Sequence, residues 1–452
     1  MARRWGRNRP FALLMGGAAA LLTASLVLSG CTQPGASDPV PSQASATLPG
    51  DETGAIKTAV TDAMQLAGAS GAIVGVWAPW AGSYTAGLGT TTPKGKEPVT
   101  PDMPWRIGSV TKPMTCTVLL SLVQKGQVSL NDPVTKYLPR LVGVDGLTLG
   151  QLCQNTSGLG DYSGALAPQF IDNPLRTYVP LELVSNGLGE PRAGTPGQRW
   201  SYSNAGFVLL GMALQQATGK DWATLYRDEV FGPLGMSSST LPNSDGLQAS
   251  ALHGYATVLD DVTGQPKCGS VVDDTALAPS STWTAKGVVS TLGDLKTFAQ
   301  SFATASLLQG AAKKAAWTTV PLGADVAAWE QYGMGGIQLG PMRGHSGAVP
   351  GFTTAMLSDP TSGLTVVVML NNSTSGAPYA QSLAMQLSAI AAGFKPAAGQ
   401  NAPKITLPWS ADNAKAALDQ LAVCRPAGSP PAPAATPQPT PAPPSYQPLP
   451  PD

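Results

Sequence analysis

The chain has 452 residues, and its 27 basic and 27 acidic side chains give a formal net charge of zero. Outside the first ten residues no cluster of Lys or Arg is present, which excludes nucleic acid as the main partner because phosphate binding requires a basic surface. Hydrophobic residues make up 43% of the chain, which is enough apolar material for one large folded unit.

The N-terminus has the features of an export signal, which we place at residues 1–30. Arginines at positions 3, 4, 7 and 9 precede the apolar run FALLMGGAAALLTASLVLSG. The run LSGC resembles the bacterial lipoprotein box, which implies cleavage before Cys31 and lipid attachment to it. We therefore expect a lipid-anchored protein at the cell membrane that faces the extracytoplasmic side. An uncleaved anchor helix is the alternative, and the export route, Sec or twin-arginine, stays open.

Composition divides the rest of the chain into four segments. Residues 31–50 and 425–452 are poor in bulky apolar side chains, which predicts a flexible tether and a proline-rich disordered tail. Between them we expect a catalytic domain at residues 51–395 and a C-terminal helical extension at residues 396–424.

The element pattern predicts an α+β fold, an α/β sandwich. Residues 55–67 have helical spacing, and residues 71–78 and 82–89 predict two strands joined by a turn. Near the other end, residues 351–358 and 364–372 flank the turn DPTSG and predict a hairpin, followed by a helix at residues 378–393. An antiparallel sheet built from both ends of the chain and flanked by helices explains this pattern. The middle, with apolar helices such as residues 206–219, is then an inserted, mainly helical region.

The stretch IGSVTK places a serine and a lysine one helical turn apart. The pattern predicts a helix that begins near Ser109 and ends at Gly126, with Pro113 in its first turn. A serine hydroxyl needs a base within hydrogen-bond reach, and Lys112 shares its helix face. Burial would lower the proton affinity of that lysine and make it a base. By itself, a Ser-x-x-Lys pattern also suits a helix N-cap and a solvated lysine.

Two further motifs strengthen the catalytic interpretation. Tyr202 and Asn204 form the Tyr-x-Asn pattern in WSYSNAGF, and His345, Ser346 and Gly347 form a His-Ser-Gly pattern in MRGHSGAVPGF. Together with the serine and lysine, they supply the groups that acyl transfer requires.

This set of three motifs resembles the penicillin-recognising serine hydrolases, which include class C β-lactamases, D-alanyl-D-alanine carboxypeptidases and related esterases. The stretches TSGL, YSNAGFVLLG, LGM and GVVSTLGDLKTF are also similar to that family, so the resemblance covers residues 55–393. It implies the serine β-lactamase/transpeptidase-like fold and a reaction through an acyl-enzyme.

The resemblance also implies a role for each motif residue. Ser109 would be the nucleophile, Lys112 its base, and Tyr202 a second acid/base group. Asn204 would bind the substrate amide and Lys112. The resemblance further places four residues at the pocket edge, namely His345, Ser346, Gly347 and Ala348. His345 would polarise the site or relay protons. The backbone N–H groups of Ser109 and Ala348 would hold the oxyanion.

Departures from the family pattern limit the substrate assignment. Ser346 replaces the common threonine, and Ala348 lacks the hydroxyl with which carboxypeptidases grip a substrate carboxylate. Arg343 offers an alternative carboxylate ligand, although a strand-end arginine is more often only solvated. We expect a peptidoglycan stem peptide or a related envelope ester or amide as substrate. A β-lactam substrate and a non-catalytic envelope scaffold are the alternatives.

The remaining motifs bear on disulfides and metals. If Cys31 carries lipid, Cys116, Cys153, Cys268 and Cys424 can pair in three ways, of which we favour Cys116 with Cys153 and Cys268 with Cys424. We expect no cofactor and no metal site, because the two histidines lack metal-ligand spacing. A Ser-His-Asp hydrolase is disfavoured because a Gly-x-Ser-x-Gly elbow is missing, and His253 is expected to be structural.

Overall fold

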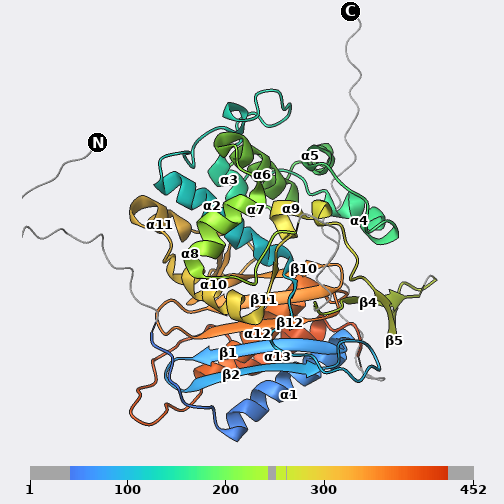
Figure 1. The fold of residues 1–452 in the computed structure, drawn as a ribbon, viewed down its shortest axis with the longest axis vertical. Helices are drawn as coiled ribbons and strands as arrows, with labels where there is room; N and C mark the ends of the chain where they lie inside the picture. Colours follow the sequence, from blue (N-terminus) through green and yellow to red (C-terminus); the bar gives the residue numbers. More distant parts are fainter. Residues whose placement is uncertain (1–40, 243–250, 261, 426–452) are drawn as a thin grey trace, which may run out of the picture. The chain divides into compact units, whose positions relative to one another are not determined.

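The computed structural model describes residues 41–242, 251–260 and 262–425. The expected signal peptide, the lipid-bearing Cys31 and nearly all of the proline-rich tail lie outside the described residues. The described residues build an antiparallel sheet with helices on both faces, and this is the fold predicted from the sequence (Figure 1). Among the described helices, none combines the length and the apolar character needed to cross a membrane.

The main sheet has eight strands in the order β2-β1-β12-β11-β10-β9-β8-β7. The strand bounds, in that order, are Gly82–Gly89, Gly71–Ala78, Thr365–Leu370, Phe352–Ser358, Met342–Val349, Ile337–Leu339, Glu330–Tyr332 and Val320–Pro321. Strands from both ends of the chain therefore pair directly, with Ala72 opposite Leu370 in β1 and β12. The predicted bounds of β1 and β2 and the predicted hairpin of β11 and β12 are confirmed.

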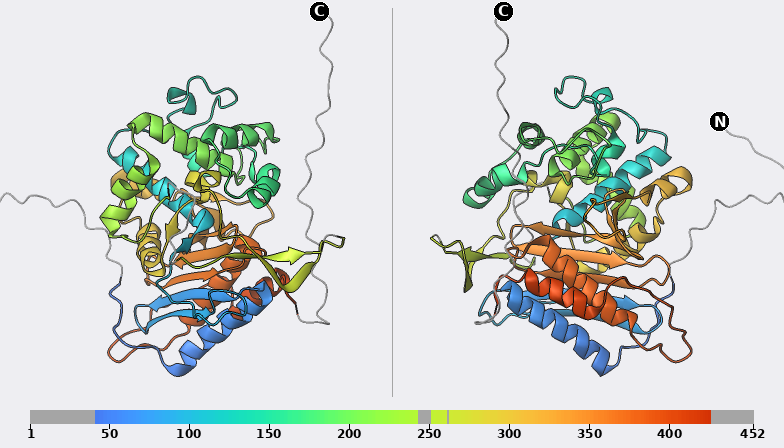
Figure 2. Two further views of the ribbon diagram at one scale, coloured as in Figure 1. Left: turned by 45° about the vertical axis from the view of Figure 1, so that its right-hand side comes forward. Right: turned by 180° about the vertical axis from the view of Figure 1, so that it is seen from behind.

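One face of the sheet is covered by the terminal helices α1 (Gly50–Ala67), α12 (Gly376–Ala392) and α13 (Ala411–Gln420) (Figure 2). Tyr379 of α12 donates a hydrogen bond from its hydroxyl to Ala63 O of α1 at 2.8 Å. Trp409, just before α13, donates from Nε1 to Met385 O at 2.9 Å. The expected C-terminal extension therefore packs in the same helical layer as α1 and α12.

Part of the expected tether, residues 43–48, contacts the folded domain. Gln43 donates from Nε2 to Ala78 O and Gly82 O at 3.1 and 2.9 Å, and Leu48 is buried. These contacts attach residues 43–48 to the β1–β2 hairpin. Composition does not reveal these contacts, because they come from single side chains and from backbone groups, such as Ala44 N, which donates to Pro79 O at 2.8 Å.

The other face of the sheet carries the inserted helical region, as predicted (Figure 2). Its elements are η1 (Gly108–Val110), α2 (Thr111–Gln124), η2 (Val134–Lys136), α3 (Leu149–Cys153), α4 (Ser163–Asp172), α5 (Pro180–Gly189), α6 (Asn204–Thr218), α7 (Trp222–Tyr226), η3 (Arg227–Phe231), α8 (Gly232–Leu234), η4 (Pro279–Ser281), α9 (Trp283–Lys286), α10 (Leu292–Thr304) and α11 (Gly310–Ala316). Two small antiparallel sheets join them, β3 (Trp105–Arg106) with β6 (Val289–Ser290) and β4 (Tyr255–Leu259) with β5 (Pro266–Asp273). Helix α2 is buried on nearly all sides and forms the centre of this region.

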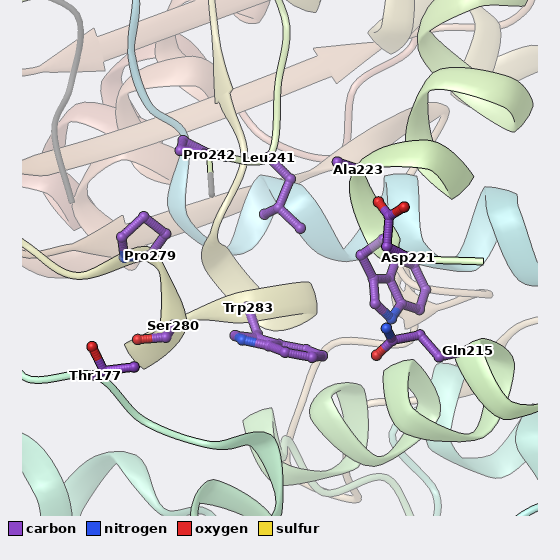
Figure 3. Close-up of a pocket in the computed structure, with 10 residues that line it drawn as sticks. Thr177, Gln215, Asp221, Ala223, Leu241, Pro242, Pro279, Ser280 and Trp283 are labelled. Carbon is purple, nitrogen blue, oxygen red and sulfur yellow. The ribbon is translucent and has the colours of Figure 1, made fainter. Parts of the chain in front are cut away.

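A cavity of about 240 Å³ lies beside α9 in the helical region (Figure 3). Its walls include the side chains of Trp283, Gln215, Asp221 and Leu241. The Asp221 carboxylate is engaged as the N-cap of α7, since it accepts a bond from Thr224 N at 2.9 Å. None of the described residues that line the cavity belongs to the three sequence motifs. The cavity is therefore not the site formed by the motif residues.

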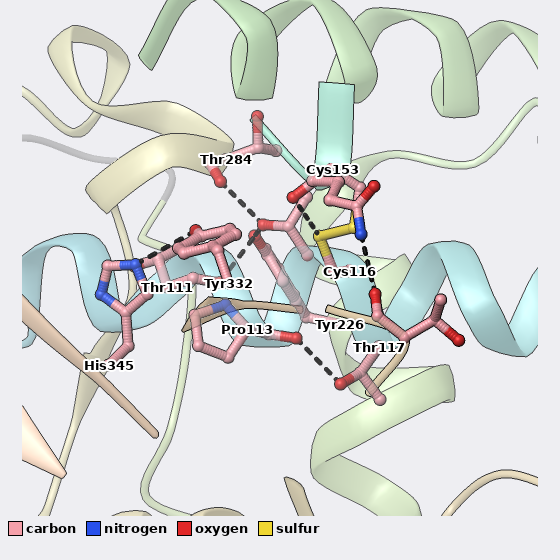
Figure 4. Close-up of a disulfide and its surroundings, with 12 residues drawn as sticks. Thr111, Pro113, Cys116, Thr117, Cys153, Tyr226, Thr284, Tyr332 and His345 are labelled. Atoms are coloured by element: carbon pink, nitrogen blue, oxygen red, sulfur yellow. Dashed lines mark hydrogen bonds between the residues drawn. A yellow bond between two sulfur atoms is a disulfide. The ribbon is translucent and has the colours of Figure 1, made fainter. Parts of the chain in front are cut away.

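Two disulfides connect distant segments. Cys116–Cys153 joins α2 to α3 and is buried (Figure 4), whereas Cys268–Cys424 joins β5 to the segment after α13. They are the same two pairs that the sequence analysis favoured. The first fixes the central helix of the helical region, and the second fixes the C-terminal segment of the fold.

Replacing Cys268 and Cys424 together by serine is expected to lower the free energy of unfolding by about 2–4 kcal/mol, because the bridge restrains a long loop in the unfolded chain. Urea unfolding without reductant measures the change. An unfolding midpoint equal to that of the wild type would contradict the structural role of this bridge.

Candidate active site

Ser109 lies where the helical region meets the sheet, in the 3-10 turn η1. Two glycines allow this turn to pack closely against β10. Gly108 has a φ of 57°, and a Cβ added at Gly347 would lie 2.5 Å from the backbone nitrogen of Ser109. A Cβ at Gly108 would lie 3.1 Å from Ala348 N. The backbone N–H groups of Ser109 and Ala348 therefore belong to one small region beside the Ser109 hydroxyl.

Lys112 is completely buried one turn after Ser109. Its Nζ lies 3.2 Å from Ser109 Oγ and donates to Asn204 Oδ1 at 2.6 Å and Ala285 O at 3.1 Å. The three oxygens come from η1, the start of α6 and α9. Contacts with three elements therefore fix the position of the Lys112 amine. One of these contacts is the Ser109 hydroxyl, for which the sequence analysis predicted Lys112 as the base.

Two hydrogen bonds hold the start of α2 against residues 284–288. The Thr115 hydroxyl donates to Thr284 O at 2.7 Å, and Val288 N donates to the Thr111 hydroxyl at 3.1 Å. Figure 4 shows the first of these bonds beside the disulfide of α2. Lys112 lies between these two attachments, so neither α2 nor α9 can shift without changing its contacts.

Burial lowers the pKa of Lys112 well below its usual value, because the interior solvates the charged form poorly. The positive charge of Lys286 lowers this pKa further, whereas the Asp161 carboxylate raises it. Lys112 therefore loses its proton at lower pH than an exposed lysine does. In the neutral state it has the free electron pair that a base needs.

Tyr202 donates a hydrogen bond from its hydroxyl to Ser109 Oγ at 2.7 Å. Asn155 braces the chain on both sides of this tyrosine, since its carbonyl accepts from Ser201 N at 2.7 Å and its Oδ1 accepts from Ser203 N at 3.1 Å. Burial raises the pKa of Tyr202, so this side chain is a neutral phenol near neutral pH. The environment therefore favours the phenol over the phenolate, and the phenol is a proton donor.

Asn204 contacts Lys112, as the resemblance implies, but its amide nitrogen is already engaged. Nδ2 donates to Asp161 Oδ2 at 2.7 Å and to Ser163 Oγ at 2.9 Å. A primary amide has two N–H hydrogens, and both are used. The expected hydrogen bond from Asn204 to a substrate amide would therefore require one of these bonds to break.

His345 lies on β10, the strand at the pocket edge, and its ring is buried. Nδ1 contacts Ser346 O, and Nε2 lies 3.3 Å from the Tyr332 hydroxyl (Figure 4). Burial and the charge of Lys112 lower the pKa of His345 to about 3, so the imidazole is neutral near neutral pH. The hydroxyl within reach of His345 is that of Tyr332 and not that of Tyr202, and a role of His345 in polarising the site or relaying protons stays a prediction.

The other polar groups near the third motif are engaged elsewhere. The Ser346 hydroxyl donates to Gln381 Oε1 of α12 at 3.1 Å. Arg343 donates to Ala303 O at 2.8 Å and lies over the Trp317 ring. Contact of either side chain with a substrate remains a prediction.

His253, the second histidine, pairs with the Asp273 carboxylate at 3.0 Å. It belongs to the β4–β5 region and not to the motif cluster. Among the described residues, no three His, Cys, Asp or Glu side chains gather so that they could hold a metal ion.

Sequence reasoning missed several residues that shape the site. Asn155 is buried with a φ of 56°, a conformation that asparagine tolerates better than most residues. It directly precedes the stretch TSGL, and its residue type was a usable signal. Asp161, Lys286 and Tyr332 gave no such signal, because none of them lies within a recognised motif.

Comparison with known proteins identifies relatives of this arrangement. A sequence model of the family described as Beta-lactamase matches residues 56–389. Penicillin-binding protein 4* of Bacillus subtilis is 27% identical over 282 residues, which cover 58% of this chain and 59% of that protein, less than two thirds of its length. D-alanyl-D-alanine-carboxypeptidase/endopeptidase AmpH of Escherichia coli is 28% identical over 293 residues, covering 59% of this chain and 71% of that protein. Among solved structures, a D-stereospecific amidohydrolase from Streptomyces sp. superposes with a TM-score of 0.61 at 27% identity, covering 71% of this chain and 93% of that one.

Replacing Lys286 by Met is expected to raise the pKa of Lys112, because it removes a nearby positive charge. Lys112 would then remain protonated to higher pH, so the acidic limb of the pH profile for Ser109 acylation should move to higher pH. Rates of fluorophosphonate labelling between pH 5 and pH 10 measure this limb. Lys296→Met, at a half-buried lysine of α10, is the control, and a limb that moves equally in both variants would contradict the assignment.

Replacing Gly347 by Ala is expected to reduce the rate of Ser109 labelling by about 100-fold or more, because the new Cβ would meet backbone atoms of η1 and separate the two N–H groups. Gly293→Ala is the matched control, since a Cβ there meets nothing within 4 Å. Equal labelling rates in the two variants would show that the contact between η1 and β10 is unimportant.

Proposed function

The chain belongs to the beta-lactamase family, and from this premise we propose that it is a serine hydrolase acting through an acyl-enzyme on Ser109. Its substrate is a peptidoglycan stem peptide or a related envelope ester or amide, so the activity is of the D,D-carboxypeptidase or esterase type. The observation that carries the proposal is the pair of contacts at Ser109 Oγ, with Lys112 Nζ at 3.2 Å and the Tyr202 hydroxyl at 2.7 Å.

The two contacts divide the proton transfers between two groups. Neutral Lys112 accepts the hydroxyl proton as Ser109 Oγ forms a bond to the substrate carbonyl carbon. When the bond to the leaving group breaks, the proton held by Lys112 returns by way of Tyr202 to the leaving nitrogen or oxygen. Water then attacks the acyl-enzyme and releases Ser109. Lys112 suits this role because its charged form has three hydrogen-bond acceptors within reach. They are the Ser109 hydroxyl and the oxygens of Asn204 and Ala285.

Strand β10 supports binding of an extended substrate. Strand β9 pairs with Met342, Arg343 and Gly344 only, and no other described strand continues that pairing along residues 345–349. The N–H groups of Ser109 and Ala348 lie at this edge and suit the oxyanion of a tetrahedral intermediate. A peptide backbone added beside β10 would place its carbonyl there.

The activities named for two relatives support a D-configured substrate. One relative is a D-alanyl-D-alanine-carboxypeptidase/endopeptidase, and a structural neighbour is a D-stereospecific amidohydrolase. Penicillin-binding protein 4* makes penicillin a suitable second probe. Because the relatives also extend beyond the matched region, the substrate of this chain is proposed only as a class.

We also propose that the protein is exported and held at the cell membrane by lipid on Cys31. This part depends on the sequence features of residues 1–31, which lie outside the described residues. An exported location gives the enzyme access to peptidoglycan, and so agrees with the proposed substrate.

Intact-mass measurement of the full-length protein after exposure to a fluorophosphonate, and separately to penicillin, tests the nucleophile. We expect one adduct that Ser109→Ala abolishes. A peptide ending in D-Ala-D-Ala should be hydrolysed in a Ser109-dependent manner, and its D-Ala-L-Ala counterpart should be cleaved much more slowly.

The outcomes separate the alternatives. Labelling and ester hydrolysis without peptide cleavage would indicate an esterase, and rapid turnover of penicillin would indicate a β-lactamase. Absence of an adduct with both probes would contradict the catalytic assignment and favour an envelope scaffold.

A further inference from the structure

Asp161 holds both the backbone and the side-chain amide of Asn204 through one carboxylate oxygen, and its other oxygen holds Ser163. It lies in the loop between α3 and α4, and its Oδ2 accepts from Asn204 N at 3.1 Å and from Asn204 Nδ2 at 2.7 Å. Its Oδ1 accepts from Ser163 N at 2.8 Å. Ser163 Oγ accepts the second bond from Asn204 Nδ2 at 2.9 Å. These contacts enclose the nitrogen end of the Asn204 amide with acceptors.

The orientation of the amide follows from these acceptors. An ionised carboxylate accepts hydrogen bonds only, so the nitrogen of Asn204 must face Asp161 and the oxygen must face the other way. On that other side, Asn204 Oδ1 accepts from Lys112 Nζ at 2.6 Å. Reversing the amide would place its oxygen against the Asp161 carboxylate, a contact between two acceptors, and would turn its nitrogen toward Lys112 Nζ, which is itself a donor.

The orientation of Asn204 in turn decides where the electron pair of Lys112 points. A neutral amine has two N–H hydrogens and one electron pair, and Lys112 has three oxygen neighbours. Asn204 Oδ1 and Ala285 O accept only, so they take both hydrogens. The electron pair is therefore left for the hydroxyl proton of Ser109, at 3.2 Å.

We propose that Asp161 is a positioning residue, which fixes the Asn204 amide so that the electron pair of Lys112 is directed at the Ser109 hydroxyl. The inference rests on the proposed function of Ser109 and Lys112. It adds a residue outside all three sequence motifs, and it explains why Asn204 has no amide hydrogen left for a substrate.

The charged and titratable groups around Lys112 come from four elements. Asp161 precedes α4, Lys286 ends α9, Tyr202 precedes α6, and His345 lies on β10. Tyr202 and His345 are neutral near neutral pH, as shown above. Asp161 raises the pKa of Lys112, so loss of its negative charge should lower this pKa and move the acidic limb of the rate profile to lower pH.

Asp161→Asn tests the proposal, because it preserves the shape of the side chain but replaces one acceptor oxygen by a donor nitrogen. We expect the rate of fluorophosphonate labelling of the full-length protein near neutral pH to fall by about 10- to 100-fold. We also expect the acidic limb to move to lower pH, opposite in direction to the shift expected for Lys286→Met. A role in folding alone would lower the labelled amount equally at every pH and leave the limb in place.

Asp294→Asn is the matched control. Asp294 is also partly buried and accepts two bonds, from Ser238 N at 3.0 Å and the Ser239 hydroxyl at 2.7 Å, but it belongs to α10 and not to the site. Its variant should label at the wild-type rate. If Asp161→Asn does not reach the folded state, as judged by circular dichroism, Asp161→Ser removes the same charge and is interpreted in the same way.

The outcomes distinguish this inference from the proposed function. If the wild type is labelled at Ser109 and Asp161→Asn matches it in rate and in pH profile, the positioning role is wrong and the proposed function stands. If Asp161→Asn is slower with an unmoved acidic limb, the role is structural and the proposal is overturned. If the wild type is not labelled at all, both fail.

Discussion

A lysine amine buried away from water is the constraint on which the rest of the site depends. Taking an ammonium ion into the interior costs several kcal/mol, and each unit by which a pKa moves corresponds to about 1.4 kcal/mol. Lys112 loses its proton more readily because it is buried, and its hydrogen-bond partners among the described residues are the oxygens of Ser109, Asn204 and Ala285, with no carboxylate. The same burial that disfavours its charge makes it a base.

The fold separates the two requirements of acyl transfer. Helices of the inserted region hold the base, with α2 bonded to residues 284–288 through Thr115 and Thr111. The sheet supplies the rigid edge of β10, where Gly347 allows the turn of Ser109 to approach. Ser109, the proposed nucleophile, lies at the contact between these layers, so the proposed proton transfer depends on the helical region and the proposed oxyanion site depends on the approach of η1 to the sheet.

Sequence patterns predicted the elements whose signals are local. Two short stretches joined by a turn predicted β1 and β2 with their bounds, and the turn DPTSG marked the hairpin of β11 and β12. Strands β7, β8 and β9 have only two or three residues each, which is too short for any periodicity to appear. In the site, the motifs predicted that Ser109, Lys112 and Tyr202 act together. Asp161 instead acts on Asn204, which is 43 residues away in the sequence. Its role depends on a contact that only the folded chain creates.

The most direct test of the account is the protonation state of Lys112 in the folded protein. Lysine-selective ¹³C and ¹⁵N labelling followed by heteronuclear NMR reports the titration of each amine, and the Lys112 signal is identified by its loss in Lys112→Met. The account predicts a Lys112 pKa well below that of the exposed lysines and a neutral amine at the pH of activity. A Lys112 signal that titrates together with the exposed lysines would contradict it, because a permanently charged lysine cannot accept the proton of Ser109.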